Sequence, residues 1–241
     1  MSEWSAKRFW KTETVEPAEG GFAILLDGRN VKTPAKRALI APTEDMAQAI
    51  AAEWAAQAEK IDPLSMPFTR AANAAIDKVS IQKDEVAAMI AEYGGSDLLC
   101  YRAERPQRLA DRQAAAWDPL LDWAKDTYGV RFTVAQGIMH HPQTDETMNV
   151  LRRIVAAQGP YSLTALHDLV SLSGSLIMGL AVQQGAYSQD QMWNDSIIDD
   201  TFQMEEWGHD DDAFDVLQIK ANSFANAARF QQLIGIHSHS V

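Results

Sequence analysis

The chain has 241 residues and carries 33 acidic against 21 basic side chains, which gives a net charge of −12. Because phosphate groups and anionic lipids are bound by basic surfaces, this balance argues against a nucleic-acid-binding protein and against docking on an anionic membrane. A single cysteine excludes an internal disulfide framework and a cysteine-based zinc site, and a hydrophobic content of 46% argues against wholesale disorder.

Residues 1–42 predict a small antiparallel β domain. The apolar run at 22–26 is followed by the turn signal Asp27-Gly28 and by residues 30–33, whose composition is typical of a returning strand. We expect two further strands in this domain, one at 38–40 and an earlier one that contains Phe9 and Trp10.

Residues 43–241 predict a larger all-α domain, so the expected fold class is α+β. Thr43 precedes two acids and begins a helix whose buried stripe contains Met46, Ile50 and Trp54. Caps, proline and glycine breaks and apolar periodicity predict further helices along the chain. One ends near 79, one covers 84–93, one starts at 106 and kinks or restarts at 119, one covers 144–159 and one covers 210–235. A short extended piece is expected at 132–134.

The segment 162–185 is the strongest candidate for a buried helical region. Leucines give it one apolar face, and small residues such as Gly174 and Gly179 would allow neighbouring helices to pack closely. Its most apolar part, 169–182, has 14 residues and is too short to cross a bilayer, so we expect no membrane insertion.

The negative charge is concentrated in one segment. Residues 154–219 contain no lysine or arginine but hold 11 of the 33 acids, and ten of these lie between 190 and 215. Ser188 and Gln191 form a capping box that opens an acidic helix, and Gly208 closes it. Asp210, Asp211 and Asp212 lack the spacing of a calcium loop and are expected to cap the last helix.

Helical spacing separates the acids of this helix into two groups. Glu205 shares a face with Ile198 and Phe202 and is expected at the border of the core, whereas Asp199 and Glu206 are expected to point outwards.

Three interpretations of the acidic helix remain open. It is an ordinary solvated face, a docking face for a basic partner, or a set of carboxylates in a hydrolase or metal-assisted enzyme that uses helix 190–207. In a docking face Trp207 would be an apolar anchor, and a core tryptophan is an equal alternative. Arg105, Arg108 and Arg112, spaced by three and four residues, would neutralise part of the face if they pair with it.

The usual signatures of catalysis are absent. The sequence has no P-loop, no dinucleotide fingerprint and no nucleophile elbow. The adjacent His140 and His141 point different ways on most backbones, His237 and His239 lie near the end of the chain, and Cys100 has apolar neighbours. We therefore expect no catalytic residue, no metal and no cofactor.

A set of short segments, spread in order along most of the chain, has a recognisable sequence. The segments are 8–11 (RFWK), 26–29 (LDGR), 31–34 (VKTP), 53–54 (EW), 66–67 (MP), 69–73 (TRAAN), 76–77 (ID), 93–102 (YGGSDLLCYR), 117–121 (WDPLL), 202–203 (FQ) and 207–208 (WG). Together they resemble the ATP synthase F(1) assembly chaperones of the ATP12 type, over about Lys7 to Phe230.

This resemblance implies a β domain followed by a helical domain, and a function without catalysis. Family members bind the free F(1) α subunit and prevent its aggregation until a β subunit replaces them. An acidic position just before the Phe-Gln pair is tied to function in the family, which here is Asp199 or Asp200. With the reading of the helix, the expected partner-binding set is Asp199, Asp200, Gln203, Glu205, Glu206 and Trp207.

The resemblance also implies a location. Family members occur in mitochondria and in related bacteria, and the acids near the start of this sequence are unlike a transit peptide. We expect a monomer in the bacterial cytoplasm, with eukaryotic relatives in the mitochondrial matrix.

Overall fold

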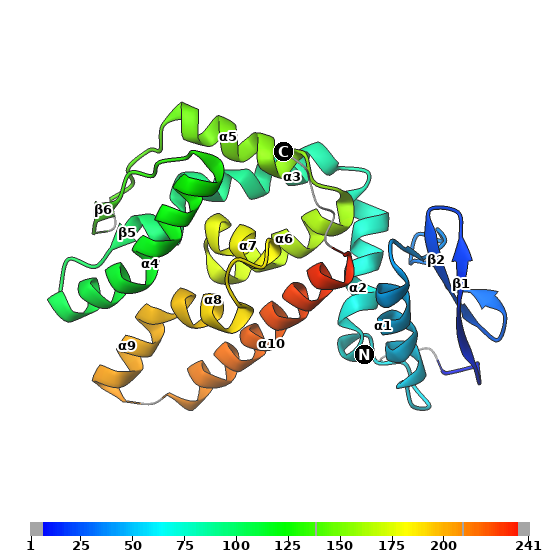
Figure 1. The fold of residues 1–241 in the computed structure, drawn as a ribbon. Coiled ribbons are helices and arrows are strands. Elements are labelled where there is room, and N and C mark those ends of the chain that lie inside the picture. The colour runs from blue at the N-terminus through cyan, green and yellow to red at the C-terminus, as the bar shows by residue number, and fades with distance from the viewer. Residues whose placement is uncertain (1–6, 138, 209, 236–241) are drawn as a thin grey trace. The chain divides into compact units, whose positions relative to one another are not determined.

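A computed structural model describes residues 7–137, 139–208 and 210–235 (Figure 1). The chain forms two compact units, the first from residues 1–82, 159–165 and 229–241, the second from 83–158 and 166–228. The α+β class predicted from the sequence is confirmed, with a small antiparallel sheet followed by helices. The division predicted at residue 42 falls between the four-stranded sheet and the first helix, which is a different place from the boundaries of these units.

The first unit contains a four-stranded antiparallel sheet. Its strands are β1 (Glu13–Ala18), β2 (Gly21–Leu26), β3 (Arg29–Asn30) and β4 (Ile40–Ala41), and β2 pairs with each of the other three. The apolar run predicted at 22–26 is β2, which lies between the others and is buried over its last four residues.

Two strand predictions were wrong in position. The earlier strand is β1 rather than the segment around Phe9 and Trp10, because the polar sequence of β1 alternates only weakly and gives little strand signal. The returning strand is two residues long, and beyond it the Val31 N–H donates to the Ile24 carbonyl at 2.8 Å.

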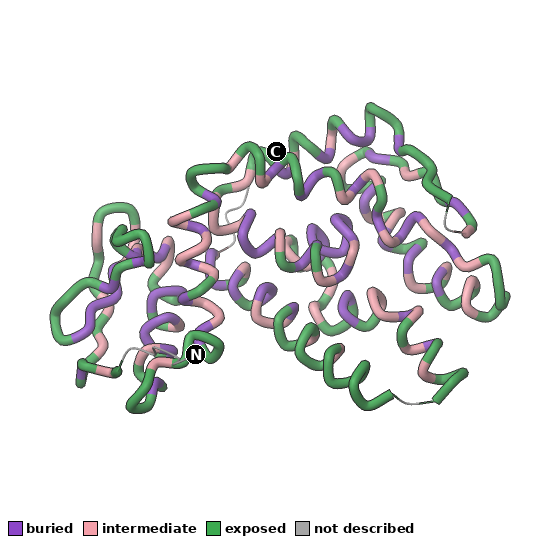
Figure 2. Tube along the Cα trace, turned by 180° about the vertical axis from the view of Figure 1, so that it is seen from behind, coloured by how far each residue is buried: buried purple, intermediate pink, exposed green. Residues whose placement is uncertain are grey.

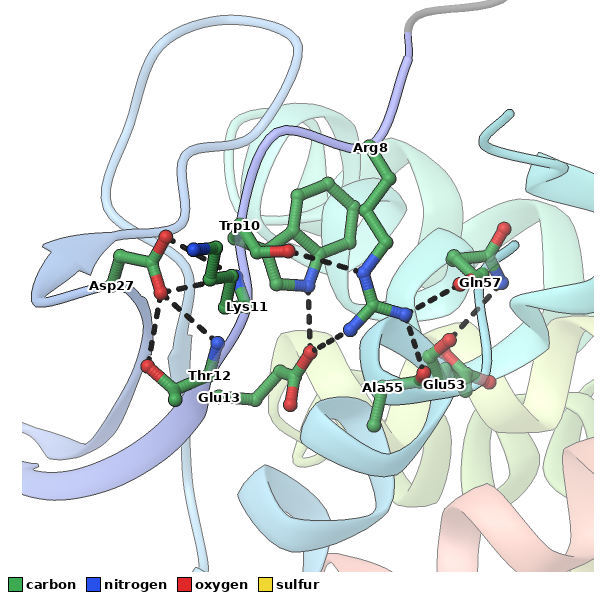
Figure 3. A network of polar contacts seen from close by, with 9 residues as sticks. All are labelled: Arg8, Trp10, Lys11, Thr12, Glu13, Asp27, Glu53, Ala55 and Gln57. Atoms are coloured by element: carbon green, nitrogen blue, oxygen red, sulfur yellow. Dashed lines mark hydrogen bonds and ion pairs between the residues drawn. The ribbon is translucent and has the colours of Figure 1, made fainter. Parts of the chain in front are cut away.

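Polar contacts tie the segment before β1 to the rest of this unit (Figure 3). Arg8 donates to the Glu13 carboxylate at 2.8 Å and to the carbonyls of Ala55 and Gln57 at 2.9 and 2.6 Å, and Trp10 Nε1 donates to Glu13 at 2.7 Å. The segment is therefore held through side chains instead of a strand ladder.

The turn after β2 is held in the same way. Asp27 adopts a positive φ of 47°, and its carboxylate accepts hydrogen bonds from the N–H groups of Lys11 and Thr12 (Figure 3). These backbone hydrogen bonds lower the pKa of Asp27.

Helices α1 (Glu44–Ala55) and α2 (Pro67–Ala74) complete the core of the first unit. Thr43 caps α1 as predicted, accepting from the Met46 N–H at 3.2 Å. Met46 and Ile50 are fully buried, and Trp54 is half-buried against them. After α2 the chain continues as a π-helical turn, Ala75–Val79, which ends where the second helix was predicted to end.

Glu53 joins the two helices. Its carboxylate is buried and accepts from the N–H groups of Phe68 and Thr69 at 2.6 and 2.8 Å and from the Thr69 hydroxyl at 2.6 Å. These are N–H groups in the first turn of α2, which would otherwise lack partners inside the helix. A side chain of α1 therefore caps the N-terminus of α2.

The second unit is helical. Its elements are α3 (Lys83–Glu92), α4 (Gln107–Tyr128), α5 (Asp145–Ala156), most of α6 (Pro160–Ser173), α7 (Leu176–Gln183), α8 (Gln189–Ser196), α9 (Ile198–Trp207) and most of α10 (Asp211–Leu233), with 3-10 turns at Tyr93–Ser96 and Leu98–Cys100 and a parallel pair of short strands, β5 (Tyr101–Arg102) and β6 (Ala135–Gln136).

Two details of these helices differ from the predictions. Helix α4 continues through Pro119 without a restart, and Asp118 forms an ion pair with Arg102 at 2.8 Å in place of capping a new helix. The extended piece lies at 135–136, directly after the predicted 132–134. Both differences arise from contacts between distant elements, which local propensity does not contain.

The apolar segment 162–185 is buried as predicted and forms two helices, α6 and α7 (Figure 2). Gly174, with φ of +73°, ends the first, and Ser175 caps the second by accepting from the Met178 N–H at 3.1 Å. Of the residues described, no helix combines the length and apolarity needed to cross a membrane.

Gly179 allows α7 to approach α6. A Cβ added there would lie 2.8 Å from Val170 Cγ2 and 3.1 Å from Leu166 Cδ1. Both neighbours are fully buried and have no room to move away.

Asp97 is the most deeply buried charge-bearing group of the second unit. One carboxylate oxygen accepts from the Leu99 N–H and the other from the Ile177 N–H, both at 3.1 Å, so it caps the 3-10 turn and the start of α7 together. Loss of hydration raises its pKa to about 6, against the opposing effect of hydrogen bonds from Ser175 and the backbone.

We predict that Gly179→Ala destabilises the protein. Overpacking at such a site costs about 1–3 kcal/mol, more than the roughly 1 kcal/mol that alanine gains in helix propensity. Urea denaturation measures the difference. Gly95→Ala is the matched control, because its Cβ would meet only Met148 at an ordinary 3.7 Å; equal stability of the two variants would contradict the prediction.

We predict that Asp97 makes stability pH-dependent. Its pKa rises from 3.8 to about 6 on folding, so the native state binds the proton more tightly. The contribution of Asp97 to the free energy of unfolding is therefore largest below the lower value and is lost, by about 3 kcal/mol, as pH rises through the higher one. The free energy of unfolding of the wild type relative to that of Asp97→Asn should therefore fall across this range, and a constant difference between the two would exclude Asp97 as the source.

Candidate partner-binding site

The acidic segment folds into two consecutive helices instead of one. Ser188 caps α8 by accepting from the Gln191 N–H at 3.2 Å, as predicted. The chain then leaves helical geometry at Ile197 and re-enters it as α9, which ends at Gly208 with φ of +97°. The break at Ile197 therefore separates the acids of α8 from those of α9.

Apolar residues anchor this pair of helices in the second unit. Met192, Trp193, Ile198 and Phe202 are buried, and Trp117 Nε1 of α4 donates to the Asp195 carbonyl at 2.8 Å. Helix α4 therefore packs against α8, and it also contacts α9.

Arginines of α4 pair with the last acids of α9. Arg112 donates to both carboxylate oxygens of Glu205, at 2.9 and 3.0 Å, and Arg108 forms an ion pair with Glu206. The Arg108 guanidinium also lies over the ring of Phe202, 4.8 Å from its centroid. The internal pairing considered from the sequence is thus present for two of the three arginines.

Arg105 does not belong to this row. It precedes the first residue of α4 and lines a hollow of about 500 Å³ between β5, α4 and α9. The hollow is also lined by Arg102, Glu104 and the α9 residues Asp199 and Gln203.

Asp199 does not point outwards as helical spacing suggested. It is half-buried, and its carboxylate accepts a hydrogen bond from Gln113 Nε2 at 2.6 Å. Gln113 is 2% exposed and also accepts from the Ala103 N–H at 2.7 Å. Sequence reasoning missed this glutamine, although it sits on the inner stripe of α4, midway between Leu109 and Trp117.

The other predicted site residues face solvent. Asp200 and Gln203 are exposed, and the side chain of Trp207 is 82% exposed at the end of α9. The alternative of a core tryptophan at this position is therefore wrong. Of the six predicted residues, three are engaged with α4 and three are presented to solvent.

The three aspartates that follow α9 behave as helix-start residues. The Asp210 carboxylate accepts from the Ala213 N–H at 3.1 Å, and Asp211 and Asp212 lie in the first turn of α10. Acids at this position interact favourably with the positive end of the helix dipole.

The remaining candidates for chemistry are occupied structurally. Cys100 is buried, which raises the pKa of its thiol and keeps it protonated at neutral pH. His140 Nδ1 lies 3.0 Å from the Tyr101 hydroxyl, while His209, His237 and His239 lie outside the described residues. Within the described part of the chain, no three His, Cys, Asp or Glu side chains are grouped so as to hold a metal ion.

Comparison with known proteins identifies the family. The model for the "ATP12 chaperone protein" family matches residues 7–125. The mitochondrial protein atp12 of Schizosaccharomyces pombe is 26% identical over 224 residues, which cover 88% of this chain and 77% of that protein.

Solved structures match over nearly the whole chain. Atp12 from Paracoccus denitrificans is 46% identical, with a TM-score of 0.93 over 96% of this chain and 100% of that chain. An aspartate-to-lysine mutant of Paracoccus denitrificans Atp12p has the same identity and TM-score. A putative chaperone from Agrobacterium tumefaciens is 38% identical, with a TM-score of 0.89 over 94% of this chain and 85% of that chain.

These matches exclude a catalytic role for the acidic helix. Family members are chaperones and not enzymes, so the alternative of a carboxylate-dependent hydrolase or metal-assisted enzyme is wrong. The chain belongs to the ATP12 family of ATP synthase assembly chaperones, as its ordered set of segments predicted.

Proposed function

We propose that this chaperone binds the free F(1) α subunit and shields its interface until a β subunit replaces the chaperone. The observation that carries the proposal is Trp207, a large apolar side chain left 82% exposed at the end of an acidic helix. Exposed aromatic side chains are frequent anchors of protein interfaces, and a chaperone needs apolar area and complementary charge in place of a reaction site.

The six predicted residues divide into two roles in this proposal. Asp200, Gln203 and Trp207 contact the client directly, because they are already exposed. Asp199, Glu205 and Glu206 are held by Gln113, Arg112 and Arg108, so they position α9 and meet the client only if those pairs open.

We also propose a cellular location and an oligomeric state for the chaperone. The chaperone works as a monomer in the bacterial cytoplasm, a location supported by the bacterial sources of its solved relatives, Paracoccus denitrificans and Agrobacterium tumefaciens. Its eukaryotic relative in Schizosaccharomyces pombe is a mitochondrial protein.

The direct experiment is a pull-down of purified, nucleotide-free F(1) α subunit by the full chain, together with light scattering of the α subunit as it aggregates. We expect a complex at micromolar concentration, suppression of scattering, and release of the chaperone when β subunit is added. The absence of a complex would contradict the proposal.

We predict that Asp200→Lys weakens α-subunit binding by about tenfold or more, because a like charge then faces the basic groups of the client. Glu146→Lys is the matched control, because it makes the same change of charge at another exposed acid in the first turn of a helix. Titration by fluorescence anisotropy gives the dissociation constants. Equal binding by wild type and Asp200→Lys would remove Asp200 from the site.

We predict that Arg108→Gln combined with Arg112→Gln tightens α-subunit binding several-fold at low salt. These substitutions free Glu205 and Glu206 for the client, and their cost in stability is small because exposed ion pairs contribute about 0–1 kcal/mol. Arg152→Gln, which breaks a comparable exposed pair with Glu92, is the control and should leave binding unchanged. Weaker binding by the double variant would show that the pairs themselves build the site.

A further inference from the structure

Exposed apolar side chains gather where α9 is followed by α10. Ten large hydrophobic residues are exposed among the residues described, and four of them lie within 13 positions: Trp207 (82%), Phe214 (40%), Val216 (51%) and Ile219 (67%). Single exposed apolar residues are ordinary in a soluble protein, so this group indicates an interaction surface only where its members share one face of a helix.

The first half of α10 leaves one of its faces in water. Asp212, Asp215, Val216 and Ile219 follow each other at helical spacings of three, one and three residues, lie on one side of the helix and are all exposed. We call these four residues the α10 stripe. Helix α9 ends at Trp207 and α10 begins at Asp211, so Trp207 precedes the stripe by only a few residues in the chain.

The opposite face of α10 is buried only in the second half of the helix. Helical spacing places Phe214, Phe224 and Ala228 on that face, yet full burial within the second unit begins at Phe224, whose ring centroid lies 5.7 Å from that of Trp193. In the first three turns of α10, the side chains of Val216 and Ile219 therefore remain available to a partner.

The charge on the stripe identifies the chemistry of that partner. Asp212 and Asp215 form no ion pair with any described lysine or arginine, in contrast to Glu205 and Glu206. The sequence has no base between Ile154 and Ile219. A segment that covers Val216 and Ile219 must therefore bring basic groups to the two aspartates.

We propose that the α10 stripe docks a basic amphipathic helix of the client, whose lysine or arginine side chains face Asp212 and Asp215 and whose aliphatic side chains cover Val216 and Ile219. Such helix-on-surface recognition combines apolar anchors with charges that set the register. The identification of the client as the F(1) α subunit rests on the proposed function. The charges and apolar side chains of the α10 stripe are independent of that identification.

The first test uses a synthetic helical peptide with leucines on one face and lysines on the other, and a scrambled peptide of the same composition. Because the whole chain is acidic, only a preference for the amphipathic peptide counts. We expect the full chain to bind it more tightly than the scrambled one, and Val216→Gln with Ile219→Gln to lose about tenfold in affinity, since two aliphatic contacts are removed. Glutamine is a good helix former, so α10 should persist.

Removing the charges tests the other half of the stripe. Asp212→Asn with Asp215→Asn should weaken binding about threefold or more and reduce its dependence on salt. The matched controls are Ile81→Gln with Met89→Gln, which change exposed apolar residues elsewhere, and Asp84→Asn with Glu85→Gln, which change exposed acids in the first turn of α3. Both control pairs should bind the peptide like the wild type, and circular dichroism checks that every variant is folded.

The second test repeats the titrations with purified F(1) α subunit. Loss of α-subunit binding in the stripe variants, with normal binding by the controls, supports the proposal in full. If the wild type binds the amphipathic peptide through the stripe but does not bind the α subunit, the surface stands and the proposed client is wrong. If stripe variants and wild type bind the peptide equally, or the scrambled peptide binds as well, the α10 stripe is not a docking surface.

Discussion

Glu53 and Asp97 are carboxylates withdrawn from water and satisfied by the backbone of another element, and each compact unit depends on one of them. Glu53 accepts from the first turn of α2, and Asp97 accepts from the 3-10 turn before β5 and from the start of α7. A buried carboxylate without such donors would cost several kcal/mol, so neither contact can be lost without moving the helix that it begins. The raised pKa of both groups reflects how completely hydration has been removed. Helix starts in this fold are thus fixed by residues distant in sequence as well as by local caps.

The same kind of contact accounts for several of the segments by which the family resemblance was recognised. Glu53, in segment 53–54, accepts hydrogen bonds from Thr69, the first residue of segment 69–73. The Thr33 hydroxyl donates to Asp77 at 2.7 Å, which joins segments 31–34 and 76–77. Each contact connects elements inside one unit, so these four segments report how the chain folds, whereas segments 202–203 and 207–208 belong to the predicted site on α9. Family membership and fold were therefore predictable together, whereas the partner surface, which makes few internal contacts, had to be inferred from charge and exposure.

Predictions from the sequence succeeded where the decisive interaction is local. The caps at Thr43 and Ser188 satisfy backbone groups three residues away, and the glycine after α9 adopts the positive φ that ends a helix. They failed where a distant element decides the outcome. Periodicity placed Asp199 in solvent, and only the position of α4 shows that Gln113 holds it. The apolar spacing on α10 likewise continues from Phe214 to Ala228 although only its second half is fully buried, because a helical pattern contains no information on whether a neighbour exists to bury it.

Pairing with α4 changes what the concentrated negative charge means. Glu205 and Glu206 lie against guanidinium groups, so their charges are compensated at short range and contribute weakly to the potential felt by a partner. Asp200, Asp212 and Asp215 have no such compensation from a described base and dominate the field at this end of the second unit. Because exposed charges are screened within about 8–10 Å at physiological salt, this field acts only on a partner that is already near. Apolar contact at Trp207, Val216 and Ile219 must then supply the affinity, while the aspartates select basic partners and set their orientation.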